Sequence, residues 1–258
     1  MTAGPSTVLK ALFLLDLFNE QRASIGLSEF AKLSGYHKAT TLRFLTALET
    51  KGFVEQDQVS REYMLGPAFL RFSLLREASF PFADAVNTVL RDLNAATKET
   101  AHASIVAGDA LANIGVVHSK QTNRIIIAAG EAMPLHATAS GLCVLAFSAA
   151  DIVTSVLDQE LAVHAKRTIT DPQRISELLD EVRDLGIAYT DETFCDDVLG
   201  IAAPFFGQGG KVCGAVAVAL PSVRGTTQQT HPIEAHVKSA ARRLTTLRGG
   251  SYPDSFPE

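Results

Sequence analysis

Apolar residues in the N-terminal quarter of the chain recur first with helical and then with extended spacing. The spacing predicts a first helix over Ser6–Glu20, and Gln21–Ile25 is expected to be a short connection. Ser28 is predicted to be the N-cap of a second helix, which Gly35 ends after about two turns. A third helix is predicted over His37–Lys51.

Two short strands are expected after the third helix. Phe53–Glu55 and Arg61–Leu65 have the composition of strands, and the polar loop Gln56–Ser60 separates them. A helix, a short helix, a tight turn, a longer helix and a two-stranded ribbon follow one another in a winged helix-turn-helix. Because the turn at Gly35 is so short, the second and third helices must cross steeply. The third helix then protrudes as a rod that fits the ~12 Å major groove of B-DNA.

The predicted third helix has an apolar face and a polar face. Thr41, Phe44, Leu45 and Leu48 follow the spacing of a stripe that packs against the first two helices. The opposite face, with one residue of the second helix and two of the ribbon, supplies the candidate DNA contacts. These are Ser28, Lys38, Ala39, Thr40, Leu42, Arg43, Gln58 and Arg61.

The chemistry of these side chains explains why they are candidates for DNA contact, but a plainer interpretation is also open. Lys38 and Thr40 lie in the first turn, where base edges and phosphates approach a recognition helix, and Arg43 can fork onto a guanine or a phosphate. An outward Leu42 would cover a thymine methyl group. The alternative is that the two cations are merely solvated surface charges, and that the two ribbon residues belong to an exposed hairpin tip.

Helical and extended patterns also alternate beyond the ribbon. A linker helix is predicted over Gly66–Ala78, and Ser79–Pro81 is expected to break it. Further helices are predicted at Phe82–Thr97, Leu142–Phe147, Pro172–Leu185 and along the stripe Ile233–Leu247, and strands at Thr100–Ala107, Ala110–Val117, Arg124–Ala128, Ile187–Thr190, Val198–Phe206 and Val212–Leu220. The expected class is α+β, with a winged helix-turn-helix over residues 1–66, a linker helix over 67–79 and a second domain over 80–250.

Composition narrows the class of protein. The 258 residues are 47% apolar and 20% charged, which is enough for packed cores. No apolar run approaches the ~20 residues of a membrane span, and the N-terminus lacks the basic start of a signal peptide, so we expect a cytoplasmic protein without a membrane partner. Cys143, Cys195 and Cys213 form no C-x-x-C pair. Buried thiols are therefore expected rather than a disulfide, a metal site or a cofactor.

Charge is unevenly distributed along the chain. The net charge is −5, which by itself does not indicate a nucleic-acid binder. Residues 1–77 contain nine Lys and Arg against eight Asp and Glu, whereas the rest of the chain contains 14 against 20. This concentration of acidic residues in the C-terminal portion suits a regulator whose DNA-binding surface is small and local.

Two runs of small residues are candidate ligand-binding features. Ala137–Gly141 opens a predicted helix, where uncovered backbone N–H groups and the helix dipole favour a carboxylate or a phosphate. A tightly packed helix start with Thr138 as N-cap is the alternative. Ala215, Ala217 and Ala219 share one face of a predicted strand. Their methyl groups leave space either for a ligand or for a packing helix.

Catalytic motifs are missing from the sequence. His136 with Ser140, or Cys195 with a nearby His, would be the nucleophile and base. No G-x-S-x-G surrounds Ser140, and the acids near Cys195 weaken it as a nucleophile. H-E-x-x-H, Walker and G-x-G-x-x-G motifs are absent, and Gly207–Gly210 is expected to be a hairpin turn. We therefore predict that the protein is not an enzyme.

Four segments resemble those of IclR-type bacterial transcriptional regulators. The run Gly35–Val54 resembles the helix-turn-helix of the family, and Tyr63–Gly66 resembles the end of its wing. Pro134–Gly141 is similar to the family's P-L-H-x-T-A-x-G-K-A segment, and Gly186–Glu192 followed by Gly200–Pro204 is similar to another. Because the segments occur in the right order, the resemblance covers nearly the whole chain.

The resemblance implies a DNA-binding regulator, more often a repressor, that forms a homodimer or a dimer of dimers (a homotetramer). It also implies a GAF-like effector-binding domain for a small organic or aromatic acid of a catabolic pathway. Leu142 replaces a usual Lys, Thr41 a usual Val and Gly200 a usual Cys. These departures leave the expected fold intact and bear on the identity of the ligand.

Carried over position by position, the resemblance implies an effector pocket that includes the small-residue runs. Its lining would be Ile125, Ala139, Ser140, Thr190, Asp191, Val198, Gly200, Ala217 and Ala219. The N–H groups of Ala139 and Ser140 would bind a carboxylate. Since Ala217 and Ala219 stand where some members have hydroxyl residues, we expect an effector with an apolar or aromatic body rather than a two- or three-carbon acid.

The hypothesis from the sequence is thus a regulator that binds double-stranded operator DNA and responds to a small-molecule effector. The alternative is an architectural or dimeric DNA-binding protein that needs no ligand, and an enzyme ranks below both.

Overall fold

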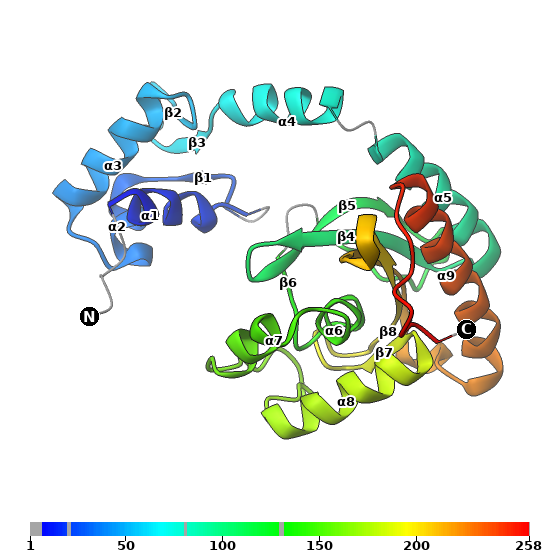
Figure 1. Ribbon diagram of the computed structural model, residues 1–258. Coiled ribbons are helices and arrows are strands. Elements are labelled where there is room, and N and C mark those ends of the chain that lie inside the picture. The colour runs from blue at the N-terminus through cyan, green and yellow to red at the C-terminus, as the bar shows by residue number, and fades with distance from the viewer. Residues whose placement is uncertain (1–6, 20–21, 80–81, 129–131, 258) are drawn as a thin grey trace. The chain divides into compact units, whose positions relative to one another are not determined.

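The computed structural model describes residues 7–19, 22–79, 82–128 and 132–257. The chain divides into two compact units, Met1–Phe80 and Pro81–Glu258, each with its own buried core (Figure 1). Helices and short strands build the first unit, and helices around a single sheet build the second. The predicted α+β class is therefore confirmed.

The first unit has the element order of a winged helix-turn-helix. Its elements are α1 (Thr7–Phe13), a 3₁₀ turn η1 (Leu15–Leu17), β1 (Ser24–Ile25), α2 (Leu27–Ser34), α3 (Lys38–Thr50), β2 (Val54–Gln56), β3 (Tyr63–Leu65) and α4 (Ala68–Ser79). The strands form an antiparallel sheet in the order β1-β3-β2. Gly35 after α2 has a φ of 71°. This left-handed conformation, which glycine adopts readily, ends α2 and turns the chain into α3.

The face of α3 predicted to point inward is buried. Thr41, Phe44, Leu45 and Leu48 are all buried in the first unit. The three apolar ones pack in one cluster with residues from the other elements, namely Leu14, Ile25, Phe30, Val54 and Tyr63. This packing leaves the opposite face of α3 to solvent.

The first helix is shorter than predicted, and a strand follows it. α1 ends at Phe13, η1 comes directly afterwards, and Leu14 between them is fully buried. The predicted end at residue 20 lies outside the described residues. Ser24–Ile25, expected to be part of a connection, pairs with Tyr63 and Met64 as strand β1. Two residues are too few to carry a recognisable strand pattern.

Ser28 is not the N-cap of the second helix. α2 begins one residue earlier, at Leu27, and Gly26 is the N-cap in an extended conformation without a side-chain capping bond. Ser28 is thus the second residue of α2. The prediction that placed a cap at Ser28 is wrong because glycine is itself an acceptable N-cap, so no polar cap is needed.

The second unit is built around one sheet. Its elements are α5 (Phe82–Thr97), β4 (Thr100–Ala107), β5 (Ala110–Val117), β6 (Met133–Pro134), α6 (Ala139–Ala146), α7 (Ala150–Leu157), α8 (Pro172–Leu185), β7 (Ala188–Asp191), β8 (Val198–Phe206), η2 (Gln208–Gly210), β9 (Val212–Pro221), η3 (Ser222–Arg224) and α9 (Thr227–Leu247). The sheet has six strands in the order β6-β5-β4-β9-β8-β7, and all paired strands are antiparallel.

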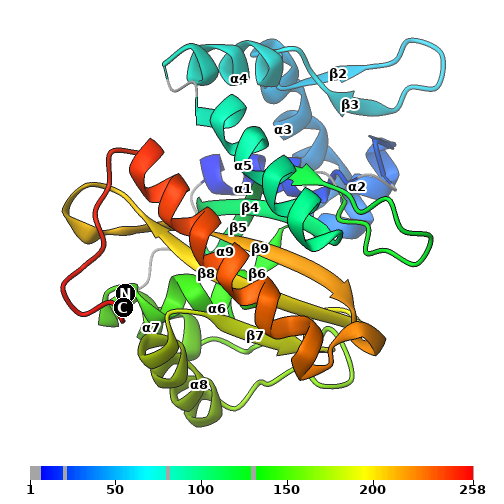
Figure 2. The ribbon, with the colours of Figure 1, turned by 90° about the vertical axis from the view of Figure 1, so that its right-hand side faces the viewer.

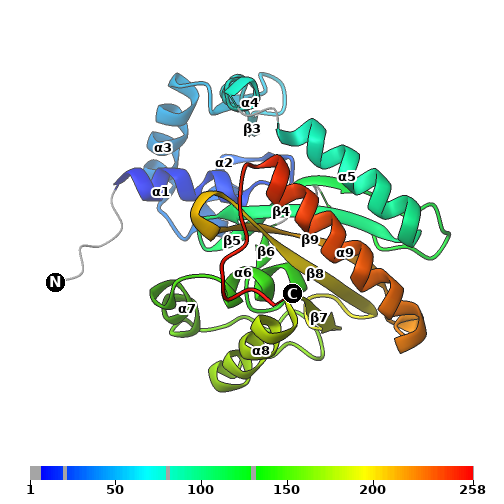
Figure 3. The ribbon, with the colours of Figure 1, turned by 45° about the vertical axis from the view of Figure 1, so that its right-hand side comes forward.

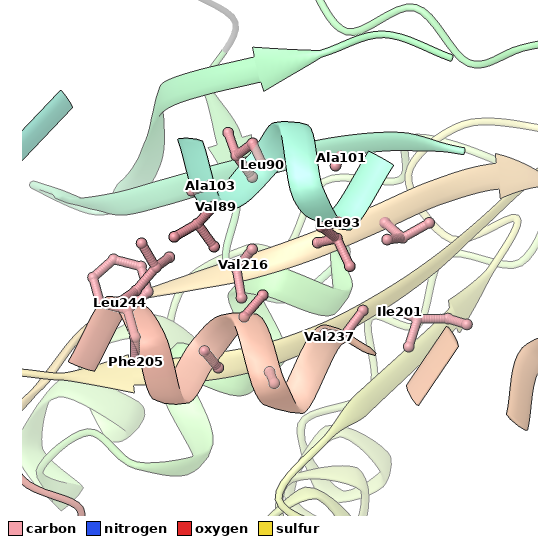
Figure 4. Close-up of a cluster of buried hydrophobic side chains, with 14 of the residues drawn as sticks. Val89, Leu90, Leu93, Ala101, Ala103, Ile201, Phe205, Val216, Val237 and Leu244 are labelled. Carbon is pink, nitrogen blue, oxygen red and sulfur yellow. The ribbon is translucent and has the colours of Figure 1, made fainter. Parts of the chain in front are cut away.

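Two long helices cover one face of this sheet. α5 and α9 lie side by side across it, as Figures 2 and 3 show. Figure 4 shows Leu90 and Leu93 of α5, Val237 and Leu244 of α9, and Val216 of β9 gathered in the cluster between helices and sheet. Burial of this cluster fixes which residues of each strand face away from α5 and α9.

α6 covers the opposite face, with α7 and α8 on the same side (Figures 1 and 3). Every residue of α6 is buried. Ala215 and Ala217 of β9 pack in the cluster on this side, whereas Val216 and Val218 belong to the cluster under α5 and α9. The alternation predicted for this strand is confirmed, and a packing helix occupies part of the space over its alanine face.

The other predicted elements of the second unit are confirmed to within about two residues at most ends, with one exception. Arg124–Ala128 was expected to be a strand, but the segment has no regular structure. Its backbone bonds to side chains instead: Thr100 Oγ1 donates to Ile125 O at 2.6 Å, and His118 Nε2 lies 3.4 Å from both N and O of Ile127. The sequence pattern does not predict β6 or α7. β6 pairs with β5 at the edge of the sheet.

No helix in the described part of the chain is long and apolar enough to cross a membrane.

Candidate functional site

The exposed face of α3 carries the predicted contact residues. Lys38, Ala39, Leu42 and Arg43 are exposed and Thr40 is half-buried. These residues lie on the side of α3 opposite its buried stripe, as the spacing of apolar residues in the sequence predicts. They offer two cations, one hydroxyl and one large apolar side chain.

Ser28 reaches this face from the neighbouring helix. The Lys38 ammonium group donates a hydrogen bond to Ser28 Oγ at 2.9 Å. The contact joins the first turn of α2 to the first turn of α3. It also holds one of the two cations in a defined position at the N-terminal end of α3.

The loop between β2 and β3 is held by its own hydrogen bonds. Asp57 accepts from the N–H groups of Ser60 at 2.6 Å and Val59 at 2.9 Å, and these bonds lower the pKa of its carboxyl group. Gln58 Nε2 donates to Gln56 O at 3.3 Å, so one predicted contact residue is engaged within the loop. Arg61 is exposed and has a left-handed φ of 62°. The structure thus presents Arg61, with Gln58, in a hairpin loop that is held by its own hydrogen bonds.

The second unit contains a cavity of about 90 Å³ between α6 and the sheet. It is lined by His102, Ile125, Ile126, Ile127, Met133, Thr138, Ala139, Ser140, Thr190, Phe194, Cys195, Val198, Gly200, Ala217 and Ala219. Eight of the nine residues predicted to line an effector pocket are among them, and Asp191 is not. Among the described residues, no Lys, Arg, Asp or Glu belongs to this lining.

Strand register explains the floor of the cavity. Thr100, Ala219, Gly200 and Thr190 are directly paired across β4, β9, β8 and β7 and so form one row. In this row the two central residues are the smallest available. The adjacent row begins with His102, which pairs with Ala217. A floor of glycine and alanine between polar flanks leaves the space that α6 does not fill.

The N-terminus of α6 meets the same cavity. Thr138 is its N-cap, and Thr138 Oγ1 accepts from the N–H of Gly141 at 3.0 Å. A Cβ at Gly141 would lie 2.3 Å from the backbone oxygen of Leu135, so this start is also tightly packed. The alternative of a tightly packed helix start with Thr138 as N-cap is therefore confirmed. It does not exclude the predicted anion site, because the first N–H groups, of Ala139 and Ser140, have no acceptor within a helix.

Asp191 is held outside the cavity by other partners. One carboxylate oxygen pairs with Arg167, and the other accepts from Ser222 Oγ at 2.7 Å. Arg167 also lies 3.4 Å from Glu192. The prediction that Asp191 lines the pocket is therefore wrong: the side chain ties β7 to the start of η3 and to the segment before α8.

His102 lines the cavity and was missed in the sequence. It is 6% exposed, and burial lowers the pKa of its imidazole to about 4. The ring is therefore neutral near pH 7. Neither its Nδ1 nor the Oγ of Ser140, both buried, has a hydrogen-bond partner in the described part of the chain. A lone His in an apolar strand between Thr100 and Ser104 was the available signal.

The three cysteines differ in exposure. Cys143 is buried, its Sγ lies 3.0 Å from Ala202 O, and burial raises the pKa of the thiol. Cys195 is exposed and lines the cavity, and Cys213 is half-buried. The expectation of buried thiols is thus right for Cys143 and wrong for Cys195, which lies in the irregular segment between β7 and β8.

Comparison with known proteins decides the family. Residues 7–58 match the family model described as the IclR helix-turn-helix domain. Residues 78–246 match the model described as the bacterial transcriptional regulator IclR C-terminal domain. The chain belongs to the IclR family. The resemblance seen in the four sequence segments is therefore confirmed.

Individual IclR-family proteins match over nearly the whole chain. The regulator KdgR of Escherichia coli K12 is 28% identical over 250 residues, which is 96% of this chain and 95% of KdgR. The crystal structure of an IclR transcriptional regulator from Silicibacter sp. TM1040 is 41% identical, with a TM-score of 0.90, and the match covers 98% of this chain and 100% of that one.

A third match is a crystal structure of an IclR homolog from Microbacterium hydrocarbonoxydans in complex with 4-hydroxybenzoate. It is 18% identical, with a TM-score of 0.77, over 95% of this chain and 100% of that one, and so shares the fold. Relatives in the family are transcriptional regulators rather than enzymes, as the missing catalytic motifs predict.

Gly200 departs from the cysteine usual in the family, but it adds little open space. A Cβ at this position would lie 2.8 Å from Thr190 Oγ1 and 3.3 Å from the Cβ of Ala139. Thr190 and Ala139 thus already approach the glycine from two sides. The missing side chain at Gly200 therefore adds little volume to the cavity.

Proposed function

We propose that this IclR-family regulator is a repressor of a catabolic operon and that a small organic acid in the second unit controls its binding to operator DNA. The chain is a DNA-binding transcriptional regulator by family, and regulators of this family are generally repressors. The observation that supports the ligand response is the cavity beside α6. The first N–H groups of α6 have no acceptor within the helix, and two buried side-chain atoms of the lining residues, His102 Nδ1 and Ser140 Oγ, have no hydrogen-bond partner in the described part of the chain.

The DNA-binding part of the proposal rests on the exposed face of α3. Lys38 and Arg43 supply the cationic groups for phosphates or guanine, Thr40 a hydroxyl and Leu42 an apolar surface for a thymine methyl. The small side chain of Ala39 would allow the DNA to approach α3 closely. Ser28 orients Lys38 through the hydrogen bond from its ammonium group. Gln58 and Arg61 at the hairpin tip are proposed to contact the sugar-phosphate backbone.

The proposal also includes operator binding by a homodimer or a dimer of dimers. The helix α4, proposed as the linker helix over 67–79, exposes large apolar side chains on several sides, including Phe69, Leu70, Phe72 and Leu74. A second α4 would cover such a surface. Two recognition helices could then bind half-sites about one helical turn apart.

The effector is proposed to be a carboxylate with an apolar or aromatic body. Its carboxylate would accept from the N–H groups of Ala139 and Ser140, where the helix dipole also favours an anion. Ile125, Val198, Ala217 and Ala219 would contact its apolar part, and Thr190 and Gly200 would border it. A relative of the same fold holds 4-hydroxybenzoate, an acid of this kind.

The enclosed volume limits how the acid can lie. About 90 Å³ is less than the roughly 150 Å³ of a cavity that holds benzene. An aromatic body would therefore extend toward the open side, where Ile126 is 69% exposed and Cys195 is exposed. Since bacterial DNA lies in the cytoplasm, we propose that the protein binds both its operator and its effector there.

The proposal is tested by fluorescence anisotropy. A DNA fragment captured from genomic DNA by the purified chain is titrated at fixed salt, alone and with a panel of carboxylic acids that includes 4-hydroxybenzoate, pyruvate and glyoxylate. Release of DNA by one of the acids supports the proposal. DNA binding that no acid alters would instead support a ligand-independent architectural protein, and tight binding of the two- and three-carbon acids alone would contradict the proposed apolar body.

A further inference from the structure

Two residues that line the cavity, His102 and Ser140, each have a buried polar atom without a partner in the described part of the chain, and these atoms indicate more about the effector than its carboxylate. We propose that the effector is a hydroxylated monocarboxylic acid, and that His102 selects it by hydrogen bonding to its hydroxyl group. This inference rests on the proposed effector site and specifies the chemical class of its ligand. It concerns a residue that the sequence pattern did not single out.

The position of His102 makes it different from its neighbours. Thr100, His102 and Ser104 point to the same face of β4, because side chains alternate along a strand. Thr100 Oγ1 donates to Ile125 O and accepts from the N–H of Ser119, and Ser104 Oγ donates to Asn113 Oδ1 at 2.9 Å. Among these three residues, only His102 has a buried polar atom without a partner in the described ranges.

The same is true of Ser140 on the other side of the cavity. Its Oγ is buried, and the residue is 2% exposed at the start of α6. Asn113 Nδ2 is also buried and unpaired, but Asn113 does not line the cavity. A polar ligand that fills the cavity would therefore satisfy two groups, one on β4 and one on α6.

Charge limits the number of carboxylates. The described part of the lining includes no Lys or Arg, and burial keeps the imidazole of His102 neutral near pH 7. One carboxylate can be held by the N–H groups of Ala139 and Ser140, with the Ser140 hydroxyl as a further donor. A second carboxylate would be desolvated without a counter-charge, which is strongly unfavourable. The site therefore fits a monoanion.

A hydroxyl group is the partner that a neutral imidazole fits best. A neutral ring has one nitrogen that donates and one that accepts. A hydroxyl group both donates and accepts, so it pairs with His102 in either tautomer, whereas a ketone only accepts. The nitrogen is already buried without a partner, so an acid without such a group would leave it unpaired and forgo this hydrogen bond. His102 would in this way favour the hydroxylated acid over the deoxy acid.

Matched pairs of acids test this selection. The binding of 4-hydroxybenzoate and benzoate, of 4-hydroxybutyrate and butyrate, and of lactate and propionate to the full chain is measured by calorimetry. We expect the hydroxylated member of at least one pair to bind about tenfold or more tightly than its partner, as a buried unpaired group predicts. The pair with the largest ratio then reports the spacing between hydroxyl and carboxylate.

Variants assign the selection to His102. His102→Leu should bring the ratio within that pair close to one, and His102→Asn, which keeps a donor and an acceptor, should retain part of it. Ser104→Ala is the matched control, since Ser104 lies on the same face of β4 and does not line the cavity. It should leave the ratio unchanged. In the wild-type chain, ¹⁵N resonances of the His102 ring should shift with the hydroxylated acid and not with the deoxy acid, which tests the contact without a variant.

Several outcomes overturn the proposal. These are equal affinities within every pair, a ratio that survives in His102→Leu, an unmoved His102 ring, or no binding by any hydroxylated acid. If the deoxy acids release DNA as effectively as the hydroxylated ones, the hydroxyl selection fails while the proposed regulator stands. If no acid of any class binds or alters DNA affinity, the proposed ligand response fails as well.

Discussion

The guanidinium of Arg43 lies on the exposed face of α3, 5.6 Å from the centre of the Phe44 ring. Phe44 itself is buried, so Arg43 lies beside the packed face of α3 and is exposed to solvent. A planar group with five donors in this position is suited to bidentate contact with guanine. Such a contact gives more specificity than a freely moving surface cation would.

Arg43→Ala is expected to weaken operator binding by roughly 1–3 kcal/mol, because a bidentate base contact is lost. Fluorescence anisotropy at constant salt measures the effect. Lys120→Ala removes an exposed cation from the second unit and should leave the affinity unchanged. Unaltered operator affinity in Arg43→Ala would exclude Arg43 from base readout.

His102 makes stability depend on pH. Burial lowers its pKa from 6.5 to about 4 in the folded chain, so the unfolded chain binds the proton more tightly. Stability contributed by the neutral ring is therefore complete above pH 6.5 and is lost as the pH falls toward 4. At pH 5 the loss is about 2 kcal/mol.

Urea unfolding at pH 7 and pH 5 checks this expectation. The wild-type chain should lose about 2 kcal/mol more between the two values than His102→Asn, which has no titrating group at this position. An equal loss in both chains would show that the buried imidazole is not the source.

At the scale of elements, a buried ion pair connects parts far apart in the sequence. Arg224 in η3 donates to both carboxylate oxygens of Glu99 at 2.7 Å and to Asn123 O at 3.0 Å. The Glu99 side chain is 5% exposed and that of Arg224 is 22% exposed. The pair thereby fixes the segment that carries Ile125 to the N-terminal end of β4.

Arg224→Ala should lower the free energy of unfolding by about 3–5 kcal/mol, because the Glu99 carboxylate would stay buried without its counter-charge, with the amide of Gln121 still donating to it. Chemical denaturation measures the change. Arg174→Ala breaks an ion pair with Glu177 in which both side chains are about half exposed, and it should cost no more than about 0.5 kcal/mol. A similar cost for both variants would mean that the buried pair contributes no more than a surface one.

The long helices and strands can be predicted from the sequence, and the cavity can be predicted in part. The 3.6-residue stripes of α3, α5 and α9 and the alternation in β9 are each long enough to identify an element. Two-residue strands such as β1 and β6 carry no period. Arg124–Ala128 has the residues of a strand, yet its backbone bonds to the side chains of Thr100 and His118, distant residues that no local pattern reveals.

The cavity lining shows the same limit. The small residues of α6 and β9 stand out in the sequence because they open a helix or alternate along a strand. The prediction that Asp191 lines the cavity is wrong because the orientation of its side chain depends on Arg167 and Ser222, which are distant in sequence. His102 was overlooked because a single polar residue in a strand has no period, and its partners across the sheet become known only from the register.

For the whole molecule, the proposed DNA contacts and the proposed effector cavity belong to units with separate cores, so the proposed regulation requires a coupling free energy between them. The two units are consecutive in the chain through α4 and α5. A coupling of ~1–3 kcal/mol, the usual range, would change operator affinity about 5–150-fold. Linkage makes such a coupling reciprocal.

The reciprocity gives a quantitative test of ligand control. The factor by which saturating effector lowers operator affinity, measured by anisotropy, must equal the factor by which saturating operator DNA lowers effector affinity, measured by calorimetry. We expect both factors to fall in the 5–150-fold range, and a His102→Leu chain at the same total acid concentration to release less DNA because fewer of its cavities are occupied. An effector that bound with equal affinity to the free and DNA-bound chain would shift no equilibrium, however tightly it bound. That result would leave the cavity as a binding site but remove it as the regulator of DNA binding.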